Sequence, residues 1–224
     1  TSICFQSLGL IRSCFYRCIL KFFALKIFHL GAGHLVYSLK IFSKFIEGNR
    51  KVTTDLKSQI TNLCRIGIAL TSERNIDVLL EMIVDESRRL TGADAGTLFI
   101  VSDDGKYLEL KIAQTQSLEI RVGGTSSIEM DESIFSPVAL FSEGQVNLSN
   151  VSAYAAYTGQ TVNIPDVYEA EEFDFSGPRR NDAAMGYRSK SMLVVPLRNH
   201  QDDNIGVLML LNAQDPESEN VIPF

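Results

Sequence analysis

The chain has 224 residues, enough for one substantial domain or for a domain with an extension. Its composition, 45% apolar and 21% charged, excludes a fully disordered or fibrous protein. The net charge of −6 is unevenly distributed, because residues 47–224 hold all 27 acidic and only 15 basic residues. Such an acidic body argues against nucleic-acid binding through a basic face. Its single cysteine, Cys64, cannot form a disulfide within it, so we expect a reducing compartment and a cytoplasmic location.

Residues 1–46 differ from the rest of the chain, because they carry six basic residues and no acidic one. A membrane anchor is one interpretation, but the longest charge-free run after Lys26 has 13 residues, whereas a span needs about 20. An interfacial helix is another, but the basic residues scatter around the helical wheel. We expect this segment to be disordered or non-native, with a membrane-proximal helix as the alternative, and membrane contact only if it is native.

The same segment contains cysteines and histidines whose spacing is similar to that of a Cys2His2 zinc finger. The four residues are Cys14, Cys18, His29 and His34. The stretch between the two pairs is shorter than the usual one of about twelve residues. Glycines also interrupt the helix that would have to carry both histidines. We therefore expect no metal site.

Residues 47–74 predict a signalling or dimerisation helix. Its apolar residues step by four and three and form a short heptad seam: Leu56, Ile60, Leu63, Gly67 and Leu70. A seam of this length is too short for a free coiled coil but is suitable for a homodimer contact. The alternative, equally compatible with the pattern, is that the helix packs on its own domain.

The next segment predicts a helix followed by strands. Asn75 is a suitable N-cap, a stripe of apolar residues follows at helical spacing, and Gly92 ends the helix. The hydrophobic period then changes to two, and an Asp-Gly pair marks a hairpin turn at 102–105. The predicted strands are 95–102, 106–114 and 118–122.

The second half of the chain predicts one helix and three longer strands. Pro165 restricts the first of these strands to an edge of the sheet, and the continuous apolar run of the last predicts a strand covered on both faces. The predicted elements are a loop with at most one short strand at 125–148, a helix at 151–158, a strand at 161–167, an irregular loop with one helical turn at 168–188, and strands at 190–198 and 205–212. This order predicts an α+β domain with an antiparallel sheet.

Four stretches together resemble the GAF domain family. They are NVSAYAAYTGQTVNIPDVY (150–168), FDFSGPRRND (173–182), GYRSKSMLVVPLRN (186–199) and IGVLMLLNAQD (205–215). The resemblance covers about residues 56–224 and is strongest to the GAF modules of bacterial cyclic-nucleotide signalling proteins, including those joined to HD-GYP phosphodiesterases or nucleotide cyclases. It implies a GAF domain at 75–224 that is truncated before its closing helix. It also implies a central antiparallel sheet with dimer helices on one face and a ligand pocket on the other.

Cyclic-nucleotide-binding members of this family carry an Asn-Lys pair, then Phe and, three residues later, Asp-Glu. Asn212 matches the Asn, but Ala213 occupies the Lys position. Phe224 matches the Phe, and no Asp-Glu pair follows it. Asn181 also stands where related bacterial modules usually have Phe. The sequence therefore matches the cyclic-nucleotide pattern only in part.

The resemblance and the residue types indicate a ligand site around the 151–158 helix and the 168–188 loop. The amides at the amino end of that helix suit a phosphate or carboxylate, and capping by Asn150 is the equal alternative. The tyrosines of the helix could stack on a base, although aromatic residues at this spacing more commonly pack in the core. Arg179 and Arg180 could bind a phosphate, although arginines in such a loop are more commonly solvated. The candidate ligand residues are Asn150, Val151, Ser152, Tyr154, Tyr157, Asp166, Phe173, Asp182, Tyr187 and Ser189.

Nothing in the sequence supports catalysis by this part of the protein. The acidic body has one histidine, His200, and no cysteine beyond Cys64, so no nucleophile–base pair is available. We expect a regulatory GAF domain that needs no cofactor, forms a homodimer, binds a small ligand such as a cyclic nucleotide and controls a C-terminal output domain. The alternative is a ligand-free dimerisation and relay module of a phosphodiesterase or cyclase.

Overall fold

The computed structural model describes residues 67, 72–126 and 136–224. Residues Asn75–Leu197 and Asp203–Phe224 form one unit, and Thr1–Arg74 with Arg198–Asp202 form a second. In the second unit, the described residues include an ion pair between Arg198 and Asp202 at 2.9 Å. The heptad seam, apart from Gly67, and the cysteine–histidine set lie outside the described residues. Within the described part of the chain, no helix is both long and apolar enough to cross a membrane.

The helix α4 (Ile76–Thr91) forms as predicted. The Asn75 side chain accepts a hydrogen bond from the Asp77 amide at 2.9 Å, and Gly92 ends the helix with a φ of 69° that few other residues adopt easily. Most of its apolar stripe is buried, at Leu79, Leu80 and Ile83, and the helix packs against β1 (Ala93–Val101), while Ile76 in the first turn is 49% exposed. The local capping signals therefore set both ends of this helix.

The central sheet has the strand order β3-β2-β1-β9-β8-β7. Every strand pair whose register is described is antiparallel, and β7 is at an edge, as Pro165 predicted. The other strands of this path are β2 (Tyr107–Thr115), β3 (Ile120–Gly123), β7 (Val162–Ile164), β8 (Met192–Arg198) and β9 (Asn204–Gln214). The α+β class with an antiparallel sheet is thus confirmed.

The prediction of at most one short strand between 125 and 148 was wrong. The described part of this stretch contains β4 (Val138–Ala139), β5 (Phe141–Ser142) and β6 (Gln145–Val146). The pair β5–β6 turns through Glu143 and Gly144, both with positive φ, the geometry of a tight hairpin. A Glu-Gly turn lacks the usual Asn-Gly or Asp-Gly signal, so the sequence did not indicate it. A short strand β10 (Val221–Ile222) also pairs with β9.

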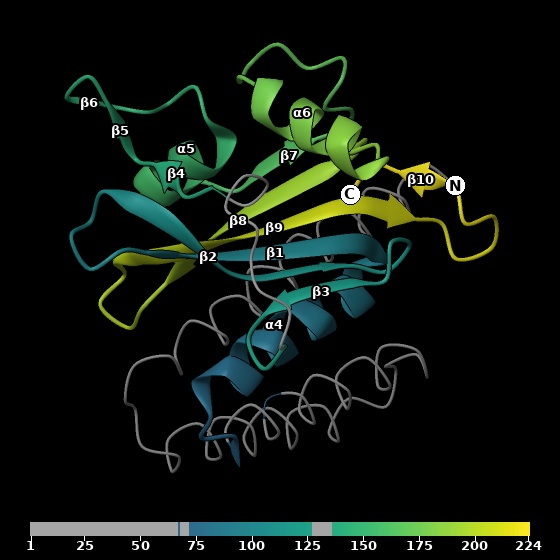
Figure 1. Ribbon diagram of the computed structural model, residues 1–224, viewed down its shortest axis with the longest axis horizontal. Coiled ribbons are helices and arrows are strands. Elements are labelled where there is room, and N and C mark those ends of the chain that lie inside the picture. Colours follow the sequence, from purple (N-terminus) through teal and green to yellow (C-terminus); the bar gives the residue numbers. More distant parts are fainter. Residues whose placement is uncertain (1–66, 68–71, 127–135) are drawn as a thin grey trace, which may run out of the picture. The chain divides into compact units, whose positions relative to one another are not determined.

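Two helices lie on the sheet face opposite to α4 (Figure 1). The helix α5 (Val151–Thr158) has the predicted bounds, with Asn150 as N-cap and Gly159 as C-cap. The helix α6 (Ser176–Met185) corrects the prediction of an irregular loop with one helical turn. Pro178 lies in its first turn, where a missing N–H breaks no helical hydrogen bond, so the Gly-Pro pair that suggested a loop is compatible with a helix.

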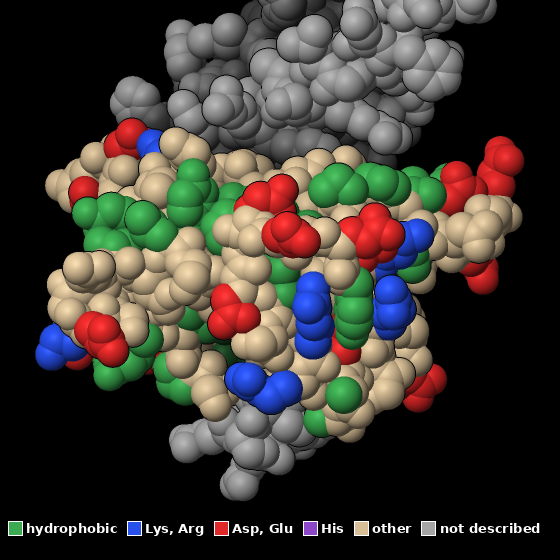
Figure 2. Space-filling model, turned by 90° about the horizontal axis from the view of Figure 1, so that it is seen from above, with side chains coloured by type: hydrophobic (Ala, Val, Ile, Leu, Met, Phe, Trp, Pro, Cys, Tyr) green, Lys and Arg blue, Asp and Glu red, His purple; other side chains and the backbone are tan. Residues whose placement is uncertain are grey.

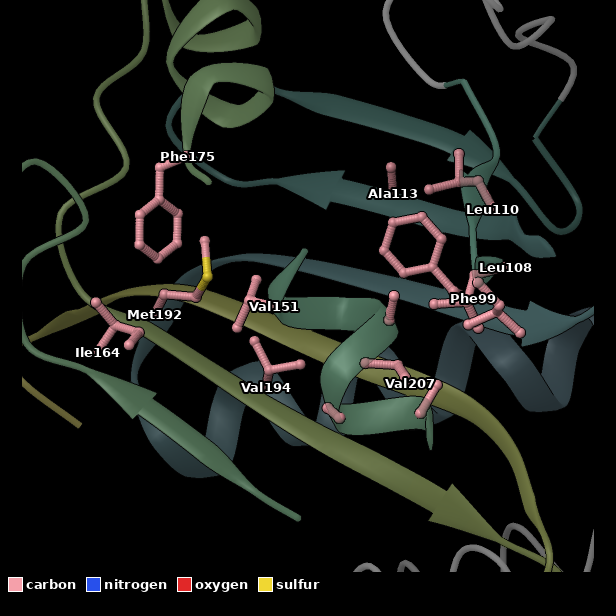
Figure 3. Close-up of a cluster of buried hydrophobic side chains, with 14 of the residues drawn as sticks. Phe99, Leu108, Leu110, Ala113, Val151, Ile164, Phe175, Met192, Val194 and Val207 are labelled. Carbon is pink, nitrogen blue, oxygen red and sulfur yellow. The ribbon is translucent and has the colours of Figure 1, made fainter. Parts of the chain in front are cut away.

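A cluster of buried apolar side chains fills the space between the sheet and α5 (Figure 3). Val151 and the alanines of α5 pack there against Val194 of β8 and Val207 of β9, and Phe175 closes the end near α6. The strand β9 contacts α4 on one face and α5 on the other, which confirms that its continuous apolar run is covered on both faces. Because side chains fill this face, space for a ligand has to be found nearer the rim.

Candidate functional site

The amino end of α5 is capped by the protein itself. The side-chain oxygen of Asn150 accepts hydrogen bonds from the amides of Ser152 at 3.0 Å and Ala153 at 3.1 Å. Ser152 and Val151 are both buried. Two of the amides that were candidates for binding an anion therefore already donate to Asn150. Capping by Asn150 is the alternative to anion binding that the sequence left open.

The predicted aromatic residues separate into two groups. The Tyr154 ring meets the Phe173 ring edge-on, with 5.3 Å between centroids, and its hydroxyl donates to Gln160 at 3.0 Å. Tyr157 instead is 58% exposed. Asp166 lies in the turn after β7, where its carboxylate accepts from the Tyr168 amide at 2.9 Å. The structure thus joins Tyr154 with Phe173 and leaves Tyr157 and Asp166 apart from them.

Asp182 of α6 is a buried acceptor, with 6% of its surface exposed. One carboxylate oxygen accepts from the Tyr168 hydroxyl at 2.9 Å and from the Ser189 amide at 2.8 Å. The other accepts from the Ser189 hydroxyl at 2.8 Å. A buried carboxylate needs such donors to offset the loss of water. Asp182 and Ser189 were predicted as ligand residues, and their contact fastens α6 to the segment before β8.

Tyr187 is the centre of a second polar cluster. Its hydroxyl donates to the Asp94 carboxylate at 2.8 Å and accepts from the Asn212 amide at 2.9 Å. Asp94 also accepts from the amide and hydroxyl of Ser117, and Asn212 also donates to the Arg188 carbonyl. Burial, together with the hydrogen bond to Asp94, raises the pKa of the Tyr187 hydroxyl above its ordinary value.

A hollow with a volume of about 360 Å³ lies between the segment after β7 and the start of α6. Three aromatic and three acidic residues line it: Tyr168, Phe173, Phe175, Glu169, Glu171 and Asp174. Arg179 adds a cation to the same wall. Of the predicted ligand residues, Phe173 lines this hollow and the others do not. Figure 2, which views the face carrying α5 and α6, shows basic side chains beside hydrophobic ones there, with acidic side chains around them.

Tyr168 connects this hollow to the buried Asp182. The guanidinium carbon of Arg188 lies 4.1 Å from the centroid of the Tyr168 ring, and that of Arg179 lies 5.3 Å from it. The hydrogen bond to Asp182 raises the pKa of the Tyr168 hydroxyl. Sequence reasoning missed Tyr168, Arg188 and Asp94, because nothing in their local pattern distinguishes them from ordinary loop and strand residues.

Among the described residues, no group of three or more His, Cys, Asp or Glu side chains is arranged to hold a metal ion. The groups around the hollow suit recognition instead. Aromatic rings offer stacking surfaces, carboxylates accept hydrogen bonds from N–H groups, and guanidinium groups pair with anions. The lining thus contains residue types that can stack on a flat ring, accept hydrogen bonds from N–H groups and pair with an anion.

Comparison with known families identifies this domain. Residues 75–223 match the family model described as GAF domain. The chain belongs to the GAF family. This confirms the resemblance seen in the sequence, and as a GAF domain this part of the protein is regulatory rather than catalytic.

Curated relatives of this GAF domain include the cGMP-specific 3′,5′-cyclic phosphodiesterases of Drosophila melanogaster and Drosophila ananassae. Each is 30% identical to the chain over 148 residues, or 64% of the chain. The match spans 12% of the first relative and 11% of the second, so the chain corresponds to about a tenth of their length.

Solved structures similar to this GAF domain include the GAF domain of the Acinetobacter phosphoenolpyruvate-protein phosphotransferase. It is 16% identical, with a TM-score of 0.46, and the match covers 70% of this chain and 78% of that one. The free methionine-R-sulfoxide reductase of Neisseria meningitidis is 18% identical, with a TM-score of 0.43, and the match covers 71% and 72% of the two chains.

Proposed function

We propose that residues 75–223 form a sensory GAF domain that binds a small ligand, with cyclic GMP as the candidate, and controls an output domain of the parent protein. The observation that carries this proposal is the hollow of about 360 Å³ beside α6, with aromatic, acidic and basic groups in its wall. Its volume is within the range of about 300–1,000 Å³ that is common for small-molecule sites. The identity to cGMP-specific phosphodiesterases supports a cyclic nucleotide over other ligands.

A chain of contacts supports a route from this hollow to α4. Tyr168 binds Asp182, and the amide of Tyr187 donates to the Asp182 carbonyl at 2.9 Å. The hydroxyl of Tyr187 then reaches Asp94 of β1. The carbonyl of Asp94 accepts from the Gln116 amide, and the Gln116 side chain accepts from Arg88 of α4 at 3.4 Å. A ligand that moved Tyr168 would therefore act on a continuous set of hydrogen bonds that ends on the helix following the predicted dimer seam.

The test is ligand binding to the full chain, followed by thermal unfolding. Cyclic GMP at 100 times its dissociation constant is expected to stabilise the fold by about 2.7 kcal/mol, a shift of several degrees in Tm. Cyclic AMP, cyclic di-GMP and guanosine serve as comparisons. A larger shift with another of these compounds would replace cyclic GMP as the candidate while leaving the sensory function in place.

The second candidate function is a ligand-free dimerisation and relay module. The filled apolar face under α5 and the capped amino end of that helix favour it, because they remove two places where a ligand could bind. This candidate is supported if none of the compounds shifts the Tm while the protein remains a dimer. It is rejected if saturable binding of a nucleotide is measured by calorimetry.

A further inference from the structure

Two guanidinium groups lie against the ring of Tyr168, and one of them, that of Arg179, belongs to the wall of the hollow. Arg179 and Arg188 both lie within about 6 Å of the Tyr168 ring centroid, the range of cation–π attraction. Arg179 is also oriented by hydrogen bonds from one terminal nitrogen to the carbonyls of Val167 at 3.0 Å and Tyr168 at 3.3 Å. The Tyr168 ring therefore contacts two cations, and the carbonyls of Val167 and Tyr168 orient one of them, that of Arg179.

Neither cation forms an ion pair within 4 Å in the described part of the chain, although the Asp174 carboxylate interacts electrostatically with Arg179. The ion pairs found there involve other arginines and lysines. Like charges held together cost free energy, and an anion that binds both removes that cost.

The charged residues in the wall of the hollow differ in the part of a ligand that they attract. Glu169, Glu171 and Asp174 repel a phosphate and accept hydrogen bonds from N–H groups. Arg179 lies in the same wall and attracts a phosphate. The site therefore suits a ligand with an anionic end and a flat ring that carries hydrogen-bond donors, as guanine does.

We propose that Arg179 and Arg188, held on the ring of Tyr168, form the anion subsite of this domain and bind the ligand's phosphate in place of the amino end of α5. The amides of Ser152 and Ala153 in α5 already donate to Asn150. A guanidinium has five N–H donors, and Arg179 uses only one terminal nitrogen for its hydrogen bonds to the carbonyls, so it has further donors for a phosphate. This proposal rests on the proposed function in assuming that the ligand carries a phosphate.

The first experiment compares Arg179→Gln and Arg188→Gln with the control Arg180→Gln in the full chain. All three remove one positive charge from the same region, but Arg180 does not lie on the Tyr168 ring. Each of the first two variants is expected to weaken cyclic GMP binding about tenfold, the equivalent of about 1.4 kcal/mol, and the control less than about twofold. Guanosine, which lacks the phosphate, is expected to bind all variants equally and so reports that the site is folded.

The second experiment follows the arginine side-chain N–H signals by NMR during separate titrations with inorganic phosphate and with cyclic GMP. Shifts of the Arg179 and Arg188 signals with both probes support the subsite and the proposed function together. Shifts with phosphate alone support the subsite and overturn cyclic GMP as the ligand. Cyclic GMP binding that leaves both signals and both variants unaffected overturns the subsite while the proposed function stands. Absence of any response to either probe overturns the subsite.

Discussion

At the scale of single residues, Asp182 has a structural role that its sequence context did not indicate. It was predicted to contact a ligand from a loop. In the structure it is buried in a helix and accepts hydrogen bonds from Tyr168 and Ser189. Asp182 does not line the hollow itself, but its carboxylate holds Tyr168, which does.

Replacing Asp182 with alanine is expected to lower the free energy of unfolding by about 1–3 kcal/mol, because the donors of Ser189 would be left buried without an acceptor. Asp182→Asn, which keeps one acceptor oxygen, should lose less. Urea unfolding followed by circular dichroism measures both. If the alanine variant were as stable as the wild type and had lost ligand binding, Asp182 would be a ligand residue instead.

The raised pKa of Tyr187 leads us to expect that the free energy of unfolding depends on pH in the alkaline range. Its pKa in the folded protein is raised by burial and by Asp94, whereas the unfolded value is about 10. Above about pH 10 the unfolded chain therefore binds fewer protons than the folded one, and the free energy of unfolding falls as pH rises. Urea unfolding between about pH 9 and 11 should show a shallower fall for Tyr187→Phe. Tyr157→Phe, at an exposed position, should keep the wild-type slope, and equal slopes in all three proteins would contradict the prediction.

At the scale of elements, the ends of α5 can be read from neighbouring residues in the sequence, whereas the start of α6 cannot be read from them alone. The helix α5 begins at a side-chain cap and ends at a glycine, and both signals are visible in the sequence. The helix α6 begins without a side-chain cap hydrogen bond from its N-cap residue, Phe175, and this residue is buried in the apolar cluster. Its start therefore depends on tertiary packing as well as on local sequence.

Replacing Asn150 with alanine is expected to lower stability by about 1 kcal/mol, since it removes the acceptor for the amides of Ser152 and Ala153. Asn150→Ser keeps a capping oxygen and should retain most of the stability. Thermal unfolding of the three proteins measures the difference. Cyclic GMP affinity should change little in either variant, because the proposed phosphate site lies at Arg179 and Arg188. A large loss of affinity in both variants would instead favour the amino end of α5.

The contact between α4 and β1 depends on Gly96. A Cβ atom at this position would lie 2.8 Å from a methyl carbon of Val84 and 2.9 Å from the side chain of Arg88. Gly96→Ala is therefore expected to cost about 1–3 kcal/mol through overpacking. Gly177→Ala in α6 is the matched control, because its Cβ would meet only Arg180 at 4.0 Å, and it should be neutral or slightly stabilising. Chemical denaturation tests both, and equal stability of the two variants would show that α4 moves without cost.

At the scale of the whole molecule, the sheet separates two surfaces with different proposed roles. The helices α5 and α6 lie on one face of the sheet and α4 lies on the other (Figure 1), and the hollow is formed partly by the start of α6. The polar contacts from Tyr168 through Tyr187 to Arg88 connect these surfaces across the sheet. This arrangement suits a sensor in which a ligand on one face affects a helix on the other.

The predicted dimer depends on a seam that, apart from Gly67, lies outside the described residues. Leu63→Glu introduces a charge into this seam, where burial without a partner is costly. Light scattering of the full chain is expected to show a dimer for the wild type and a monomer for the variant, with an unchanged sheet signal in circular dichroism. Ser58→Glu, off the seam, should remain dimeric. A wild type that is monomeric at tens of micromolar, an order-of-magnitude choice for weak contacts, would contradict the dimer.

The sequence by itself determined the features that depend on neighbouring residues. The ends of α4 and α5 follow from Asn75, Gly92, Asn150 and Gly159, and the alternation of apolar residues predicted the principal strands. The combined motifs also indicated the GAF family, which the family model confirms. Capping, turn geometry and hydrophobic period all act over a few residues, so a single sequence displays them.

Only the tertiary structure decided which polar residues meet. Tyr187 and Asp94 are 93 positions apart and come together because β1 and β9 are neighbours in the sheet, with Asn212 of β9 bonded to the same hydroxyl. Likewise, Tyr168 gathers Arg179, Arg188 and Asp182 through the folding of one segment over another. Such contacts depend on strand order and burial rather than on spacing along the chain. For this reason the sequence named Asp182 and Tyr187 as ligand candidates without indicating these contacts, and it did not indicate Tyr168.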